Sequence, residues 1–414
     1  MNTISALTRM ACTISLALYL LGCTCAPPQI ASVNPASGPA GTIVEVTFTG
    51  GGLGGVVVFD GVQEETRYAS NLGLGKRLRF TVPFGATTGS KNVQVLSDGQ
   101  TSPAVAFQVT GSGTVPTPAL DGFEVATREG KEITVIGSGF NTLSRVFVDG
   151  VEVQRYAGSS LPLREIPFDF VDNVIICTPQ SDLLPGSAHT VQVRNPNNLN
   201  SNTLNITIPS RICQIEFDAI DGIPVPDYYI LRNNTINTMR RSYNACGWII
   251  ELSHDNLAVA DPLGGTAFSN ADLYSFWQAN ANVPASGNFM HGAFVTMDAG
   301  GLLGIMFMNT GSVPSLPDAE RRLGFAAFRN NFGTFQREER YLRTTIHEAG
   351  HGFNLLHSDG DGSITIMNQT GSLGTNWTHN FSNISCTHLT SHAISAVAPG
   401  QEAFGSSRSC NNLH

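Results

Sequence analysis

Residues 344–359 read TTIHEAGHGFNLLHSD, and this run constrains the chain most because it places several metal-binding side chains at helical spacings. Positions i and i+4 of a helix lie one above the other, so His347 and His351 can direct two imidazoles at a single ion. Glu348 lies one step round the helix, where it can take a proton from a water held at that ion. We therefore expect a metal site in which Glu348 is the base and not a ligand.

A third ligand follows from the position of His357, which lies six residues beyond His351. An uninterrupted helix would carry His357 away from the ion, so the helix must end between the two histidines. Asn354 is the expected break, because Asn enters the left-handed region more readily than most residues. Gly352 adds further backbone freedom.

The segment before the motif has the spacing of an amphipathic helix. An apolar stripe recurs at intervals of three and four residues, and Thr334 is the expected N-cap. The ligands should therefore lie on a rigid element. The stripe consists of Leu342, Ile346, Ala349 and Phe353.

This pattern resembles the metzincin clan of zinc peptidases, whose signature is H-E-x-x-H-x-x-G-x-x-H followed by a methionine turn; Asn354 replaces the Gly of that signature. The segment 364–368 looks like the methionine turn, with Met367 as its apolar floor, and Ser358 is similar to the matrixin subgroup. The resemblance implies a zinc endopeptidase that cleaves protein or peptide substrates, with Glu348 as catalytic base. It also implies one catalytic Zn²⁺ held by His347, His351 and His357.

The remainder of residues 212–414 is compatible with that clan. Alternating strands and an amphipathic helix precede the motif. The strand expected at 302–308 resembles the edge strand with which the clan captures an extended peptide. Expected strands cover 213–221, 248–252, 289–297, 302–308 and 323–328, with 289–297 and 302–308 forming a hairpin-like pair and a helix over 236–246.

The N-terminus has the features of an export signal. Arg9 precedes the apolar run 10–21, which is too short to span a bilayer, so residues 1–22 are the expected signal peptide. The run ends in Leu-Leu-Gly-Cys, which resembles the bacterial lipobox, and Cys23 is the expected site of lipidation. The chain should therefore be a lipoprotein anchored at the outer membrane or cell surface, or otherwise secreted.

Two copies of one pattern lie between this signal and the motif domain, about 90 residues apart. Residues 41–48 match 130–136, and Asp-Gly turns recur at 60–61 and 149–150. Their strict alternation argues for β-sandwiches, and each copy resembles the IPT/TIG immunoglobulin-like module. The expected sandwiches cover 27–110 and 119–210, joined by a linker at 111–118.

The expected fold is thus multidomain: two all-β immunoglobulin-like sandwiches, then an α+β metzincin-like domain with a mixed twisted sheet and a zinc-binding helix. A net charge of −9 argues against nucleic acid as a partner. The sequence specifies no oligomeric state. In an exported protein the cysteines of the last domain should form disulfides. The preferred pairs are Cys213 with Cys246 and Cys386 with Cys410, although the two other pairings of these four stay open.

Other features carry less weight. His388 and His392 repeat the i, i+4 spacing, but a packed C-terminal helix is favoured over a second metal site. Asp359 and Asp361 offer carboxylates to a structural Ca²⁺, although a polar turn is the preferred interpretation. The alternative function is a surface adhesin or ligand-binding protein with a catalytically silent metal domain.

Overall fold

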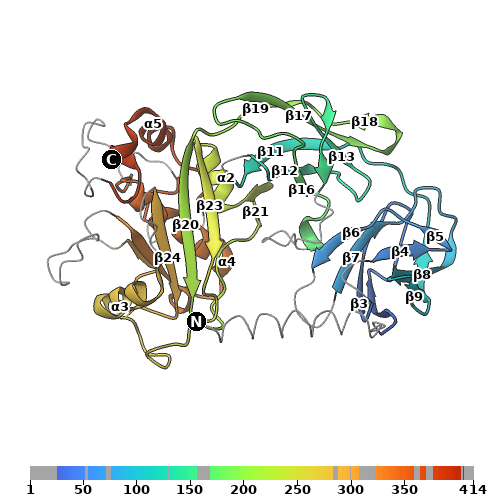
Figure 1. The fold of residues 1–414 in the computed structure, drawn as a ribbon, viewed down its shortest axis with the longest axis horizontal. Coiled ribbons are helices and arrows are strands. Elements are labelled where there is room, and N and C mark those ends of the chain that lie inside the picture. Colours follow the sequence, from blue (N-terminus) through green and yellow to red (C-terminus); the bar gives the residue numbers. More distant parts are fainter. Residues whose placement is uncertain are drawn as a thin grey trace, which may run out of the picture. The chain divides into compact units, whose positions relative to one another are not determined.

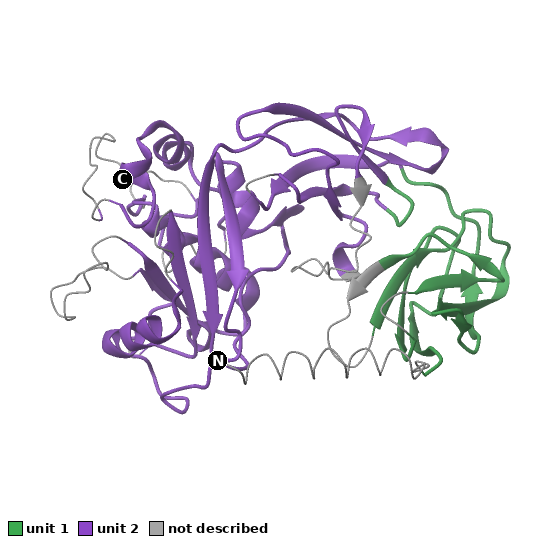
Figure 2. Cartoon of the chain, in the orientation of Figure 1, with its two compact units in different colours: residues 1–116, 141–144, 157–168 green, residues 117–140, 145–156, 169–414 purple. Residues whose placement is uncertain are grey.

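The computed structural model describes residues 26–51, 55–70, 76–127, 130–155, 168–282, 288–298, 300–306, 322–358, 364–369, 376–401 and 404 (Figure 1). Several predicted features lie outside these residues: the signal peptide, Cys23, Asp359, Asp361 and Cys410. The described residues divide into two compact units, which Figure 2 colours green and purple.

The first unit contains a sandwich of two sheets. Both sheets contribute alternate residues to one apolar core, among them Val44 and Val46 from one sheet and Val93 and Val95 from the other, all fully buried. This is the packing that the period-2 pattern predicts. One sheet has the order β1 (Gln29–Asn34), β3 (Ile43–Thr49), β7 (Lys76–Thr81), β6 (Arg67–Ser70). The other has the order β2 (Ser37–Gly38), β10 (Val105–Val109), β8 (Gly89–Ser97), β4 (Val56–Phe59), β5 (Val62–Gln63), with β9 (Gln100–Thr101) paired to β8.

The second unit begins with another sandwich, which has its own apolar core. Its sheets repeat the strand arrangement of the first, as the internal sequence repeat predicts. One sheet has the order β11 (Ala119–Val125), β12 (Ile133–Ser138), β16 (Val174–Thr178), β15 (Gln154–Arg155). The other has the order β14 (Val151–Glu152), β13 (Arg145–Val148), β17 (Ala188–Asn195), β18 (Leu199–Asn200), with β19 (Leu204–Thr207) paired to β17. Two 3-10 turns accompany them, η1 (Phe168–Phe170) and η2 (Pro196–Asn198).

The same unit continues into a mixed five-stranded sheet with helices on both faces (Figure 1). Four strands are parallel and the edge strand β25 is antiparallel to its neighbour. Helices α2 and α4 cover one face, and α3 covers the other. The strand order is β23 (Trp248–His254), β20 (Arg211–Ala219), β24 (Phe289–Val295), β26 (Gly324–Phe328), β25 (Gly304–Met306). The other elements are the hairpin β21 (Ile230–Arg232) with β22 (Thr235–Asn237), α2 (Met239–Asn244), α3 (Asn270–Asn280), η4 (Arg329–Asn331), α4 (Arg337–Gly352), α5 (Asn383–Ser391) and α6 (Ile394–Val397).

The second sandwich and this sheet share buried contacts. Asn244 of α2 bonds the backbone of Val125 in β11, accepting from its N–H at 2.6 Å. Thr238, the N-cap of α2, donates its hydroxyl to Glu124, whose side chain is fully buried. Ile249 of β23 belongs to the core of the sandwich. The two parts therefore form one packed body.

Two structural expectations were wrong. The strands at 289–297 and 302–308 do not form a hairpin, because β26 lies between β24 and β25 and pairs with both. Helix α4 begins after Gln336, which has a left-handed φ of 48°, and not after Thr334. What the fold establishes is a multidomain, β-rich protein with few helices.

Candidate metal centre

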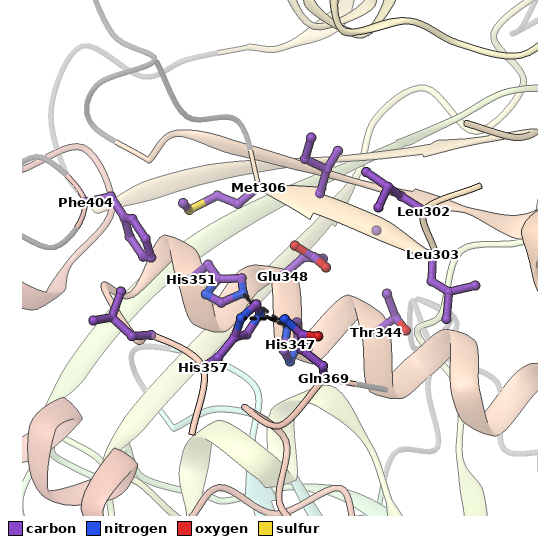
Figure 3. A pocket seen from close by; sticks show the side chains of 13 residues that line it. Leu302, Leu303, Met306, Thr344, His347, Glu348, His351, His357, Gln369 and Phe404 are labelled. Carbon is purple, nitrogen blue, oxygen red and sulfur yellow. Dashed lines mark hydrogen bonds between the residues drawn. The ribbon is translucent and has the colours of Figure 1, made fainter. Parts of the chain in front are cut away.

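Helix α4 carries the first two candidate ligands and is anchored by its apolar stripe. Leu342, Ile346, Ala349 and Phe353 are all fully buried and belong to one core with strands of the mixed sheet. Burial of this stripe against the sheet fixes the rotation of the helix about its own axis. His347 and His351 are consequently directed together toward β25 and the pocket beside it (Figure 3).

Three imidazoles converge at this position. The Nε2 atoms of His347 and His351 are 3.1 Å apart, and each lies 3.2 Å and 3.1 Å, respectively, from Nε2 of His357. Within the part of the chain that the structure describes, these residues form the one group of three or more His, Cys, Asp or Glu able to share an ion. Tetrahedral zinc with Zn–N bonds of about 2.0–2.1 Å separates its nitrogen ligands by about 3.3 Å, so the spacing fits zinc.

The opposite ring nitrogens show which atoms face the centre. The Nδ1–H of His347 donates to the carbonyl of Ile366 at 2.7 Å, and that of His351 donates to Leu355 at 2.6 Å. A carbonyl only accepts, so both Nδ1 atoms carry the proton and both Nε2 atoms present lone pairs. Two lone pairs 3.1 Å apart repel each other unless a cation or a proton lies between them. The donor chemistry therefore suits a metal ion.

Protonation of the histidines is an unfavourable alternative to binding a metal ion. Burial lowers the pKa of His347 well below its usual value, and the neighbouring His351 lowers it further. Burial also lowers the pKa of His351 to about 4. Both rings are thus neutral at physiological pH, which is the form that binds metal.

His357 reaches the centre because the chain reverses after α4. Asn354 has a φ of 63°, and its side-chain amide donates to the carbonyl of Ala396 at 2.9 Å. This confirms the expected break at Asn354. After this reversal, the N–H of Ser358 donates to the carbonyl of Met367 at 3.2 Å, which holds the segment of His357 to the turn of Met367. Met367 is fully buried beneath α4, and a Cβ on Gly350 would meet its Sδ at 2.6 Å.

The side chain of Glu348 extends from α4 toward the edge strand β25 (Figure 3). Its side chain passes so close to Gly304 that a Cβ there would meet Glu348 Cγ at 2.6 Å. The sequence analysis missed this requirement for glycine, because it arises from a neighbour far along the chain. Burial raises the pKa of Glu348 to about 8, against a lowering effect of the backbone of Met306. The carboxyl can therefore hold a proton near neutral pH.

A pocket of about 440 Å³ lies over the three histidines and Glu348. One wall is β25 with the residues before it, and Phe404 lies near His351, with ring centroids 5.8 Å apart (Figure 3). The wall is apolar apart from the histidines, Glu348, Thr344 and Gln369. A ligand with an apolar body and a metal-binding group suits such a lining. The apolar wall consists of Leu302, Leu303, Ile305, Met306, Leu356 and Phe404.

The second sandwich contains a hydrogen-bonded Ser–His–Asp set that the sequence analysis missed. His189 lies 2.6 Å from the hydroxyl of Ser187 through Nε2 and 2.7 Å from Asp149 through Nδ1. In the first sandwich the corresponding turn residue, Asp60, pairs with Lys91 at 2.9 Å. An acid–base pair therefore recurs at this turn in both copies, where it joins a strand to a turn.

Among the described residues, a disulfide joins the segment after α2 to α5. Cys246, just after α2, bonds Cys386 of α5, while Cys213 is a buried free thiol. The preferred pairing of Cys213 with Cys246 was therefore wrong, and the expected partner of Cys386, Cys410, lies outside the described residues. His388 is buried in α5, and its ring is tilted by 37° against that of His392, with ring centroids 4.9 Å apart.

No family model matches the chain, and no curated protein matches it. Similar solved structures include SGBP-B from a complex xyloglucan utilization locus in Bacteroides uniformis, with 14% identity, a TM-score of 0.17, and coverage of 44% of this chain and 49% of that one. The Yersinia pseudotuberculosis adhesin InvE has 14% identity and a TM-score of 0.16, covering 44% and 58%. Tandem Ig repeats of Dlar have 11% identity and a TM-score of 0.19, covering 44% and 97%.

This chain covers 41% of the length of a further similar structure, which was solved with a xylogluco-oligosaccharide. At such low TM-scores these likenesses carry no inference about the ligand of this chain. The metzincin assignment was wrong by these comparisons, because no family model supports it and the similar structures named above are not metallopeptidases. The predicted zinc endopeptidase function, which rested on that family, was also wrong by these comparisons.

No described helix has the length and apolar character needed to cross a bilayer.

Proposed function

We propose that this chain is an exported ligand-binding protein whose last domain, an α+β domain with a mixed sheet and a metal-binding helix, binds zinc. His347, His351 and His357 would hold the ion. The observation that carries the proposal is the convergence of three Nε2 atoms within 3.1–3.2 Å of one another at the floor of a pocket. Neutral imidazole is a preferred ligand of zinc.

The ligand would occupy the pocket of about 440 Å³ above the histidines. Its apolar walls favour an apolar ligand body, and a metal ion below them favours a coordinating group such as a carboxylate. The immunoglobulin-like sandwiches would add a second contact surface or hold the pocket away from the cell.

Zinc content and affinity test this function. The full-length mature chain should bind one zinc ion per molecule by elemental analysis and by calorimetric titration. His351→Ala should lower the zinc affinity at least 100-fold, because two nitrogens and water replace three nitrogens. His189→Ala is the matched control, since His189 lies on the second sandwich and bonds only Asp149 and Ser187 among described residues. Equal zinc affinity of the wild type and His351→Ala would refute the site.

The export route is the second part of the proposal. Lipidation of Cys23 would anchor the chain at the outer membrane or the cell surface. The Cys246–Cys386 disulfide supports an oxidising compartment. Metabolic labelling with a fatty acid should mark the wild type but not Cys23→Ala; label on both proteins would refute the anchor.

A specific observation favours a catalytic role in addition. Glu348 is buried beside the three histidines, and its carboxyl borders the same pocket. A zinc ion with three protein ligands supplies Lewis-acid chemistry and lowers the pKa of a bound water toward about 7. Glu348 would accept a proton at its carboxylate and return it to a leaving group. We therefore propose a metal-dependent hydrolase as the second candidate; peptides are not proposed as its substrates.

Glu348→Gln separates binding from catalysis. The variant should retain zinc within a few-fold of wild-type affinity but lose turnover of chromogenic ester and glycoside substrates by at least 100-fold. Undiminished turnover by Glu348→Gln would refute its role as base. An inert wild type that still binds zinc would leave ligand binding as the function.

A further inference from the structure

A buried arginine lies one helical turn before the first candidate ligand. Arg343 of α4 is fully buried. Its Nη2 atom donates to three backbone carbonyls of the turn below the helix, those of Thr365 at 2.7 Å, Ile366 at 3.1 Å and Asn368 at 2.8 Å. A planar guanidinium restricts the positions of the acceptors it bonds, so these contacts fix the turn against the helix.

One of these carbonyls is also the acceptor for a candidate ligand. Ile366 accepts from Nδ1 of His347 at 2.7 Å and from Arg343 at 3.1 Å. The two donors lie four residues apart on one helix face and share one oxygen atom. Arg343 therefore sets the position of the carbonyl that orients the His347 ring.

The same turn reaches the third histidine. The side-chain amide of Asn368 donates to the carbonyl of Ser358 at 3.1 Å, and the hydroxyl of Ser358 donates to Asn368 at 3.3 Å. Ser358 directly follows His357 in the chain. A displacement of the turn would thus move His357 relative to the two histidines on α4.

A buried positive charge is costly, which makes the placement of Arg343 informative. Its guanidinium lies 5.7 Å from the ring centroid of Trp377, a cation–π contact that offsets part of the cost. An apolar side chain of similar size would avoid the desolvation penalty altogether. What an apolar side chain lacks is the set of hydrogen bonds to the turn.

We propose that Arg343 is a positioning residue for the metal centre: by holding the turn 365–368 against α4, it sets the geometry of all three histidines. This inference rests on the proposed zinc site. Arg343 does not line the pocket over the histidines, and it acts through Ile366 on His347 and through Asn368 on His357.

The test compares Arg343→Met with Arg340→Met in the full-length mature chain. Arg340 lies on the same helix, with its guanidinium 5.9 Å from the ring centroid of Phe332. The zinc dissociation constant is measured by competition with a chromophoric chelator, and the visible spectrum of the Co²⁺ form reports the ligand geometry. Arg343→Met should weaken zinc binding about 10- to 100-fold and alter the Co²⁺ bands. Arg340→Met should match the wild type in both measurements.

Arg343→Lys should show partial rescue, because an ammonium donates to one or two of the three carbonyls. If Arg343→Met does not fold, Asn368→Ala is the deciding variant. It keeps Arg343 and removes the side-chain bonds of Asn368 to Ser358 and Thr365. It should also weaken zinc binding and alter the bands. Folded Arg343→Met or Asn368→Ala with wild-type affinity and spectrum would overturn the positioning role. A wild type without zinc affinity would instead overturn the proposed zinc site.

Discussion

Asn244 offers the sharpest test of whether the second sandwich and the mixed sheet form one packed body, because its amide bonds a strand of each. Its Oδ1 accepts from the N–H of Val125 at 2.6 Å, and its Nδ2 donates to the carbonyl of Trp248 at 2.8 Å. The side chain also donates to the carbonyl of Val125 at 3.4 Å. Asn244 is only 8% exposed, so water cannot replace these bonds readily.

Asn244→Ala should destabilise the second unit by about 2–4 kcal/mol. Each buried polar group left without a partner costs about 1–3 kcal/mol. The substitution removes the short bonds of one N–H and one carbonyl, those of Val125 and Trp248, and also the longer contact with the carbonyl of Val125, which is left out of this sum. The lower half of the summed range applies, because a carbonyl tolerates an unused lone pair better than an N–H tolerates the loss of its acceptor. For a unit of this size each kcal/mol lowers Tm by about 2–4 °C.

Differential scanning calorimetry of the full chain measures this effect. The second sandwich and the mixed-sheet domain should melt in one transition, and Asn244→Ala should shift that transition as a whole. Asn383→Ala is the control, since Asn383 is an exposed residue at the start of α5. A loss below about 0.5 kcal/mol, or separate melting of sandwich and sheet, would refute the description of the two as one packed body.

Two further predictions concern the surroundings of the candidate metal centre. Cys246→Ser with Cys386→Ser opens a loop of 140 residues and should cost about 2–5 kcal/mol, measured by urea unfolding under oxidising conditions; an unchanged midpoint would contradict a stabilising role for the disulfide. Burial lowers the pKa of His379 to about 3, so below the ordinary value of about 6.5 the unfolded chain binds a proton that the folded chain refuses. Stability should therefore fall by up to about 1.4 kcal/mol per pH unit between pH 6.5 and 3, and His379→Gln should reduce that slope; equal slopes would count against the buried neutral imidazole.

The sequence was most informative where chemistry depends on local spacing. The i, i+4 relation of His347 and His351 follows from helix geometry alone, and the left-handed backbone of Asn354 follows from the preferences of its side chain. The strands of the mixed sheet were also foreseen, because alternating and continuous apolar runs mark them. The family and the peptidase function inferred from the same motif were wrong by the comparisons, because a short motif specifies ligands and not ancestry or substrate.

Long-range contacts decided the remainder. Strand β26 lies between β24 and β25, although β24 and β25 are the closer pair in sequence. Gly304 has to be glycine because Glu348 crosses it, and no local pattern shows that approach. Likewise, nothing near Arg343 in the sequence indicates that its guanidinium bonds a turn 22–25 residues further along the chain.

The amino-acid sequence by itself determined the candidate ligand types, their order on one helix and its exit, and the alternation that makes the two sandwiches. The tertiary structure alone decided which strands are neighbours, that Cys246 pairs with Cys386, and which groups orient the histidines. The physical reason is the range of the forces involved. Backbone dihedrals and side-chain periodicity are set by adjacent residues, whereas sheet order and buried polar partners depend on the packing of the whole domain.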